Sequence, residues 1–134
     1  MAERDGRVGD ARQPELRRLT QTISWILLLA IAALSFVPPP LRPITGLPHI
    51  VEHAATYLIA GCAFGLGYPN RFLTSLAGLS TFTLAIEIVQ LWIPGRHARG
   101  LDFLVDVFSL SLGLGIARVK VHRFKLLIAR LQLS

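Results

Sequence analysis

The residues of this chain that are best suited to chemistry gather between positions 87 and 106. This stretch contains three of the four acidic residues that lie beyond the N-terminal tail, together with a glutamine and two arginines. Glu87 lies about six residues inside an apolar run, at a depth where an ionisable side chain is costly and usually serves a function or a specific partner. The stretch therefore predicts a polar cluster that contains Glu87, Gln90, Arg96, Asp102 and Asp106.

A second group of polar residues opens an earlier apolar segment. His49, His53 and Tyr57 follow one another at intervals of four residues, so they share one face of a helix. His53 is a candidate general base, and Arg96 is a candidate for holding a phosphate group beside it. No nucleophile motif accompanies these residues.

Two further uses of these residues are open on the sequence alone. His49 and His53 are one helical turn apart, as are Asp102 and Asp106, so the two pairs could supply nitrogen and oxygen ligands to a metal ion. Pairs with this spacing are common, however, and a structural role competes with both kinds of site. In that role, the cluster would be a hydrogen-bonded network that sets the register of the helices.

Four apolar blocks must position these residues. The chain has 134 residues, of which 52% are hydrophobic, and this length suits one domain. Each block has roughly the 17–25 residues that a helix needs to cross the hydrocarbon of a bilayer. Clusters of proline and glycine separate the blocks. The sequence predicts an all-α membrane four-helix bundle with short loops, with spans at residues 19–37, 49–66, 72–93 and 101–117.

The two ends of the chain are polar. Residues 1–18 carry charges of both signs and almost no apolar side chains, so we predict a mostly disordered tail there. The basic residues 118–134 fit either an interfacial helix or an extension of the fourth helix. The first block is predicted as an uncleaved helix, with a cleaved signal peptide as the alternative.

The distribution of basic residues predicts the orientation. Lys and Arg number five in the N-terminal tail, one, one and two in the three loops, and five in the C-terminal tail. Because positive residues favour the cytoplasmic side, we expect both termini in the cytoplasm and the polar cluster at the outer face. No basic stripe with interleaved aromatic residues is present, so nucleic acid is not an expected partner.

The polar residues resemble the motif of the VanZ family of small integral membrane proteins. The resemblance runs from about His49 to Gly115. It is carried first by His53 and Tyr57, and then by a more specific run and a later glycine, namely Glu87, Gln90, Pro94, Gly95, Arg96, Asp102 and Gly113.

The chain departs from the family pattern at several positions. His49 and Ile50 stand where the family has an Asp-Lys pair, Asp106 replaces an Asn, and Ser109 replaces a glycine. The missing lysine removes one cation from the cluster. Chemistry that needs that lysine is not expected in this chain.

The resemblance implies an integral protein of a bacterial inner membrane that takes no cofactor. The family is named after a protein associated with resistance to teicoplanin, a lipid-tailed glycopeptide. We expect a non-catalytic role in binding or modulating an envelope molecule, such as a lipid head group, a cell-wall precursor or a lipid-tailed drug. The alternatives are a membrane-embedded hydrolase or transferase, which could be metal-dependent, and a homo-oligomer or membrane-protein partner that docks on Gly61 and Gly65.

Overall fold

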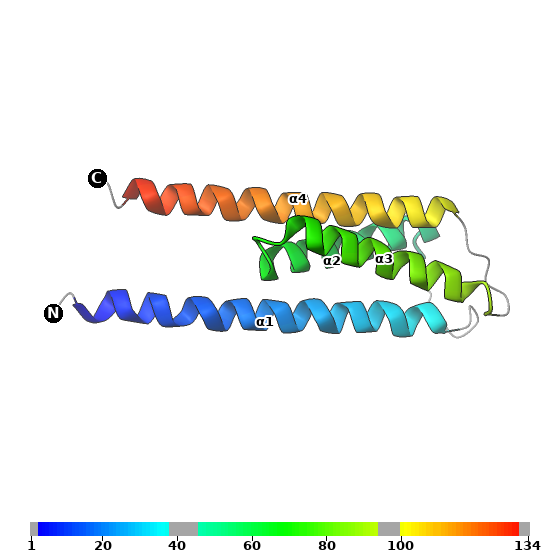
Figure 1. The fold of residues 1–134 in the computed structure, drawn as a ribbon, viewed down its shortest axis with the longest axis horizontal. Helices are drawn as coiled ribbons and strands as arrows, with labels where there is room; N and C mark the ends of the chain where they lie inside the picture. Colours follow the sequence, from blue (N-terminus) through cyan, green and yellow to red (C-terminus); the bar gives the residue numbers. More distant parts are fainter. Residues whose placement is uncertain (1–2, 38–45, 94–99, 132–134) are drawn as a thin grey trace.

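Four helices and their short connections make up the computed structural model. It describes the backbone of residues 3–37, 46–93 and 100–131, with side chains for 14–37, 46–93, 100–124, 126, 127 and 130. The regular secondary structure of the described residues consists of α1 (Glu3–Phe36), α2 (His49–Gly67), α3 (Phe72–Gln90) and α4 (Gly100–Leu131) (Figure 1). Each contains a segment that is long and apolar enough to cross a membrane. The prediction of an all-α membrane four-helix bundle is confirmed.

The helices differ from the predicted apolar blocks mainly at the ends of the chain. α1 begins at Glu3, so its helical backbone includes the segment predicted as mostly disordered. α4 continues to Leu131, so the basic C-terminal segment extends the fourth helix. The apolar segments within these two helices are Pro14–Phe36 and Gly100–Phe124. Both helices therefore run past the apolar region at the end where the chain begins and ends.

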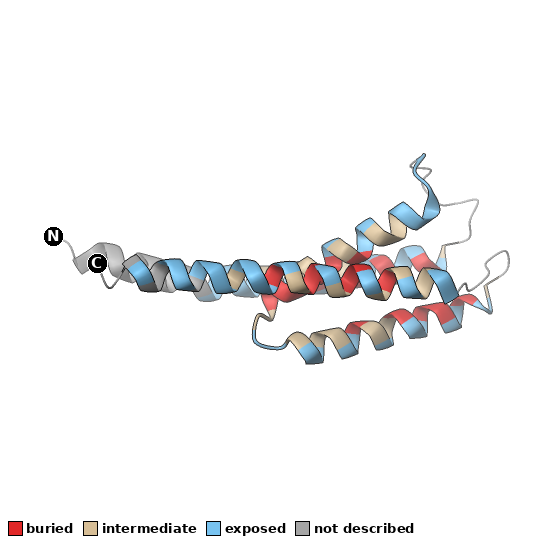
Figure 2. Ribbon diagram, turned by 90° about the horizontal axis from the view of Figure 1, so that it is seen from above, coloured by how far each residue is buried: buried red, intermediate tan, exposed pale blue. Residues whose placement is uncertain are grey.

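The helices follow the order α1, α2, α4, α3 around the bundle. α2 packs against α1 and most closely against α4, while α3 packs mainly against α4. α1 and α4 occupy opposite corners, with α2 and α3 at the other two (Figures 1 and 2). Both ends of the chain lie at the same end of the bundle (Figure 1).

Polar side chains attach α1 to the end of α2. The Gln21 amide donates a hydrogen bond to the Gly67 carbonyl at 3.0 Å. One turn further along α1, the indole N–H of Trp25 donates to the Tyr68 hydroxyl at 2.9 Å. The first bond supplies a donor to the Gly67 carbonyl, which lies in the last turn of α2 and so has no following helical N–H to accept from. The second uses the hydroxyl of Tyr68, the next residue.

Glycines bring α2 and α4 together. A Cβ atom on Gly61 would collide with the Leu110 carbonyl oxygen, and one on Gly113 would collide with the Leu58 carbonyl oxygen. A Cβ on Gly65 would lie 2.5 Å from the Ala117 Cβ. The predicted close approach at Gly61 and Gly65 therefore occurs within this chain. Because α4 covers that face, Gly61 and Gly65 do not offer the surface for a second protein that the sequence left open as an alternative.

Buried residues gather on the facing sides of the helices (Figure 2). Leu28 and Ile31 from α1 meet Phe64 from α2 and Leu114 from α4 in one apolar core. Many large apolar side chains point outward instead, among them Phe108, which is 71% exposed. In lipid such exposure has no cost, because the surrounding acyl chains are as apolar as the side chains.

The glycine contacts can be tested with two substitutions in one helix. We expect Gly113→Ala to lower the free energy of unfolding by about 1–3 kcal/mol or more, because the added methyl overpacks a backbone contact. Gly115→Ala is the matched control, since its Cβ would meet nothing within 4 Å. Thermal unfolding in detergent measures both variants. Equal midpoints for the two variants would contradict the close α2–α4 contact.

Candidate functional site

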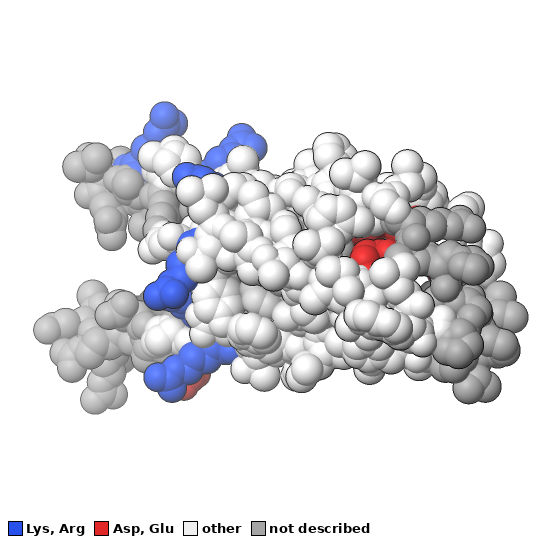
Figure 3. All heavy atoms as spheres, turned by 45° about the vertical axis from the view of Figure 1, so that its right-hand side comes forward, with Lys and Arg blue, Asp and Glu red and all other residues white. Residues whose placement is uncertain are grey.

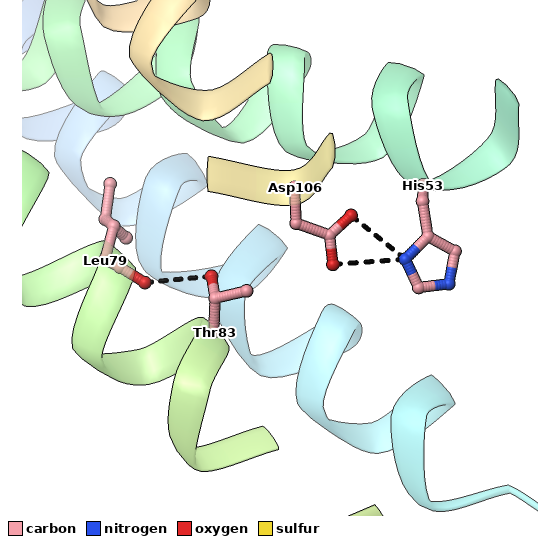
Figure 4. Close-up of polar contacts among 4 residues, drawn as sticks. All are labelled: His53, Leu79, Thr83 and Asp106. Carbon is pink, nitrogen blue, oxygen red and sulfur yellow. Dashed lines mark hydrogen bonds and ion pairs between the residues drawn. The ribbon is translucent and has the colours of Figure 1, made fainter. Parts of the chain in front are cut away.

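A histidine–aspartate pair forms the centre of the candidate site. His53 lies in the second turn of α2, and Asp106 lies at a matching height on α4. The two carboxylate oxygens of Asp106 lie 3.0 and 3.1 Å from His53 Nδ1 (Figure 4). Asp106 is only 1% exposed, whereas the His53 side chain is 16% exposed. A carboxylate buried this deeply requires such a partner.

The pair fixes the orientation of the imidazole ring. An ionised Asp106 accepts a hydrogen bond from the Nδ1–H group of His53, so in a neutral ring the proton is on Nδ1 and Nε2 is the basic nitrogen. Figure 4 shows Nε2 pointing away from Asp106. A carboxylate that orients a histidine in this way is also found in catalytic and metal-binding sites, so the geometry is compatible with several kinds of chemistry.

Tyr57 extends the pair toward the third helix. Its ring lies one turn from His53 with the centroids 6.2 Å apart, and the residue is 4% exposed. Its hydroxyl hydrogen-bonds to Asp106 and also interacts with the Thr83 side chain of α3. Thr83 itself donates a hydrogen bond to the Leu79 carbonyl at 2.9 Å (Figure 4). The contacts connect α2, α3 and α4.

The polar stripe on α3 faces the interior of the bundle. Thr83, Glu87 and Gln90 are all buried, with exposed fractions of 0%, 7% and 5%. Glu87 interacts electrostatically with Tyr57, which places it within the same cluster. Thr83 was not among the predicted site residues, although its spacing of four from Glu87 put it on the same stripe. Its complete burial and its contact with Tyr57 are visible only in the tertiary structure.

His49 and Asp102 lie one turn nearer the end of the bundle. The His49 ring stacks on His53 with centroids 4.4 Å apart, and His49 itself is exposed. Asp102 is half-buried and interacts electrostatically with Asp106. These residues form the outer layer of the cluster.

Arg96 lies outside the described residues, as do Pro94 and Gly95 of the resembling motif. The described lysine and arginine side chains all lie at the opposite end of the molecule, near the termini (Figure 3). Figure 3 also shows acidic atoms reaching the surface at the site end. The described part of the site is therefore acidic, and its polar groups come from three helices.

The described residues do not form the metal site that the sequence left open. Among the residues that the structure describes, no group of three or more His, Cys, Asp or Glu side chains is arranged to hold a metal ion. The two pairs proposed as ligands, His49 with His53 and Asp102 with Asp106, therefore do not form such a group, and even an open catalytic zinc site has three protein ligands. His53 also directs Nδ1 to Asp106.

Comparison of the chain with protein-family models, with curated proteins and with solved structures finds no match. The resemblance to the VanZ family therefore stays a prediction.

Substitutions of Asp106 measure how much the buried His53–Asp106 pair contributes to stability. We expect Asp106→Ala to lower the free energy of unfolding by about 1–3 kcal/mol, because it leaves the His53 and Tyr57 donors without their acceptor. Asp106→Asn should lower the free energy of unfolding less than Asp106→Ala, since the amide oxygen can still accept a hydrogen bond from His53 Nδ1. Asp102→Ala, one turn away and half-buried, is the control. The role given to Asp106 is wrong if chemical unfolding in detergent ranks Asp102→Ala as the more damaging change.

Proposed function

We propose that this chain is a VanZ-like membrane protein that binds or modulates an envelope-associated molecule through its polar cluster. The observation that carries the proposal is the buried Asp106 carboxylate, which His53 and Tyr57 contact inside a lipid-facing bundle. Buried ionisable groups in membrane helices usually mark a ligand, ion or proton site. The three helices contribute six titratable groups to this cluster, namely His49, His53, Tyr57, Glu87, Asp102 and Asp106.

The ligand would contact both layers of the cluster. Arg96 would bind an anionic group such as a phosphate, for which a guanidinium supplies paired donors. Glu87 and Gln90 would then hydrogen-bond neighbouring hydroxyl or amide groups, while His53 and Asp102 support the bound head. This set of partners suits the polar head of a lipid, a cell-wall precursor or a lipid-tailed drug of the teicoplanin type.

The charge distribution supports an outward-facing site. The described basic side chains lie at the end that contains both termini, and the described acidic side chains other than that of Glu15 lie at the site end. By the positive-inside rule, the termini would be cytoplasmic and the cluster would face the outside of a bacterial inner membrane.

Reporter fusions test this orientation. We expect fusions after Pro40 and Gly100 to report outside, and fusions after Asn70 and Ser134 to report inside. Enzymatic reporters that are active on only one side of the membrane give the measurement. The inverted pattern would overturn the envelope role, because the cluster would then open to the cytosol.

Ligand-induced stabilisation tests the binding role. Thermal unfolding of the purified chain would be measured with teicoplanin and, separately, with a polyprenyl phosphate lipid. We expect at least one compound to raise the midpoint, and Arg96→Ala and Glu87→Gln to remove that increase. Arg123→Ala, at the opposite end, should keep it. The proposal fails if neither compound stabilises the chain or if the two site variants respond like wild type.

A second candidate is a membrane-embedded hydrolase or transferase. The observation in its favour is the orientation of His53 by Asp106, which leaves Nε2 directed away from the carboxylate (Figure 4). Mass spectrometry of a stabilising compound after incubation separates the two functions, because a binding protein returns it unchanged. Elemental analysis addresses a metal-dependent form, for which about one zinc, manganese or iron per chain would be required.

A further inference from the structure

A cleft separates α1 from α4 at the end of the molecule opposite the polar cluster. Its volume is about 1040 Å³, and its floor includes Leu66, Pro69 and Asn70 from the end of α2 and the following turn. The cleft exists because α1 and α4 continue beyond that turn without packing on each other in the part of the chain that is described (Figure 1). The hydrogen bond from Gln21 to Gly67 holds α1 against the floor.

The cleft combines basic and apolar groups. Arg17 and Arg18 line it from α1, and Lys120 lines it from α4. All three are exposed, and none of the described side chains that line the cleft is acidic. Leu16 and Phe124 also line it and are 58% and 60% exposed. Three cations therefore border an apolar hollow that the described part of the chain does not fill.

The position of the cleft along the helices sets its depth in a membrane. The apolar run of α1 begins at Leu19, directly after Arg17 and Arg18, and that of α4 ends near Ala117, just before Lys120. These three basic residues line the cleft. The cleft thus lies at the boundary of the apolar segments, the level at which lipid phosphates and the upper parts of acyl chains meet.

We propose that this cleft binds one anionic phospholipid, with the phosphate between the arginines of α1 and Lys120 of α4. The first acyl carbons would lie along Leu16, Leu66 and Phe124. Basic pockets between membrane helices select anionic head groups, because each nearby cation adds attraction that a zwitterionic head group largely cancels. A soluble anion would satisfy the cations but leave the apolar walls uncovered, whereas a lipid covers both. The proposal is independent of the function of the polar cluster.

Native mass spectrometry of the full chain in neutral detergent tests the proposal. Phosphatidylglycerol and phosphatidylcholine of the same chain length are added in equal amounts, and the ratio of bound lipids is measured. We expect wild type to prefer phosphatidylglycerol. The double variant Arg17→Gln/Lys120→Gln should reduce that preference on the order of tenfold, because it removes two cations that each strengthen the binding of an anionic head group near the membrane surface.

The matched control is Arg123→Gln/Arg130→Gln, which removes the same charge from exposed positions of α4 that do not line the cleft. We expect this control to retain most of the preference. Equal losses in the two double variants would show general attraction to a basic end and would overturn the site. Displacement of the lipid by an equal amount of glycerol 3-phosphate, which has no acyl chains, would also overturn it, because that result indicates a site for soluble anions.

Discussion

The close approach of α2 and α4 is the contact on which the rest of this structure depends. These helices are not neighbours in sequence, and α3 is the crossover that returns the chain so that they run in the same direction (Figure 1). Gly61 and Gly113 leave no room for a side chain between the two backbones. Two turns away, the same alignment sets His53 Nδ1 3.0 Å from Asp106. A wider helix spacing would separate that pair and leave a buried carboxylate without its donor.

The apolar acyl chains around the helices explain why the polar groups converge inside the bundle. The outward faces of the helices carry large apolar side chains, and acyl chains offer no hydrogen bonds to a carboxylate or a phenol. His53 and Tyr57 therefore contact Asp106, and Thr83 contacts Tyr57, so that the polar groups of three helices meet inside the bundle. The same requirement holds the cluster in one arrangement, since moving any one helix would break contacts to the other two. A site built in this way is preorganised before any ligand arrives.

The molecule separates its charges along the bundle axis. The described acidic side chains other than Glu15 lie at one end together with His49 and His53, while the described Lys and Arg side chains lie at the other (Figure 3). Arg118 at the basic end also covers the Phe72 ring, with its guanidinium carbon 5.3 Å from the ring centroid. Such contacts let long basic side chains lie on apolar surface while their charges remain near water. The two ends therefore present different chemistry to the two faces of a membrane.

The sequence by itself determined the four apolar helices and the polar residues they carry, because span length and helical periodicity are local properties of the chain. It also indicated that the stripe containing Glu87 and Gln90 should face inward, since lipid excludes it. Only the tertiary structure decided that Asp106 pairs with His53, that Thr83 joins Tyr57, and that Gly61 and Gly65 pack against α4 instead of another protein. These contacts depend on the order of helices around the bundle and on their relative heights. Neither is encoded in the periodicity of a single segment, because each arises from the packing of residues roughly 50 positions apart, as His53 and Asp106 are.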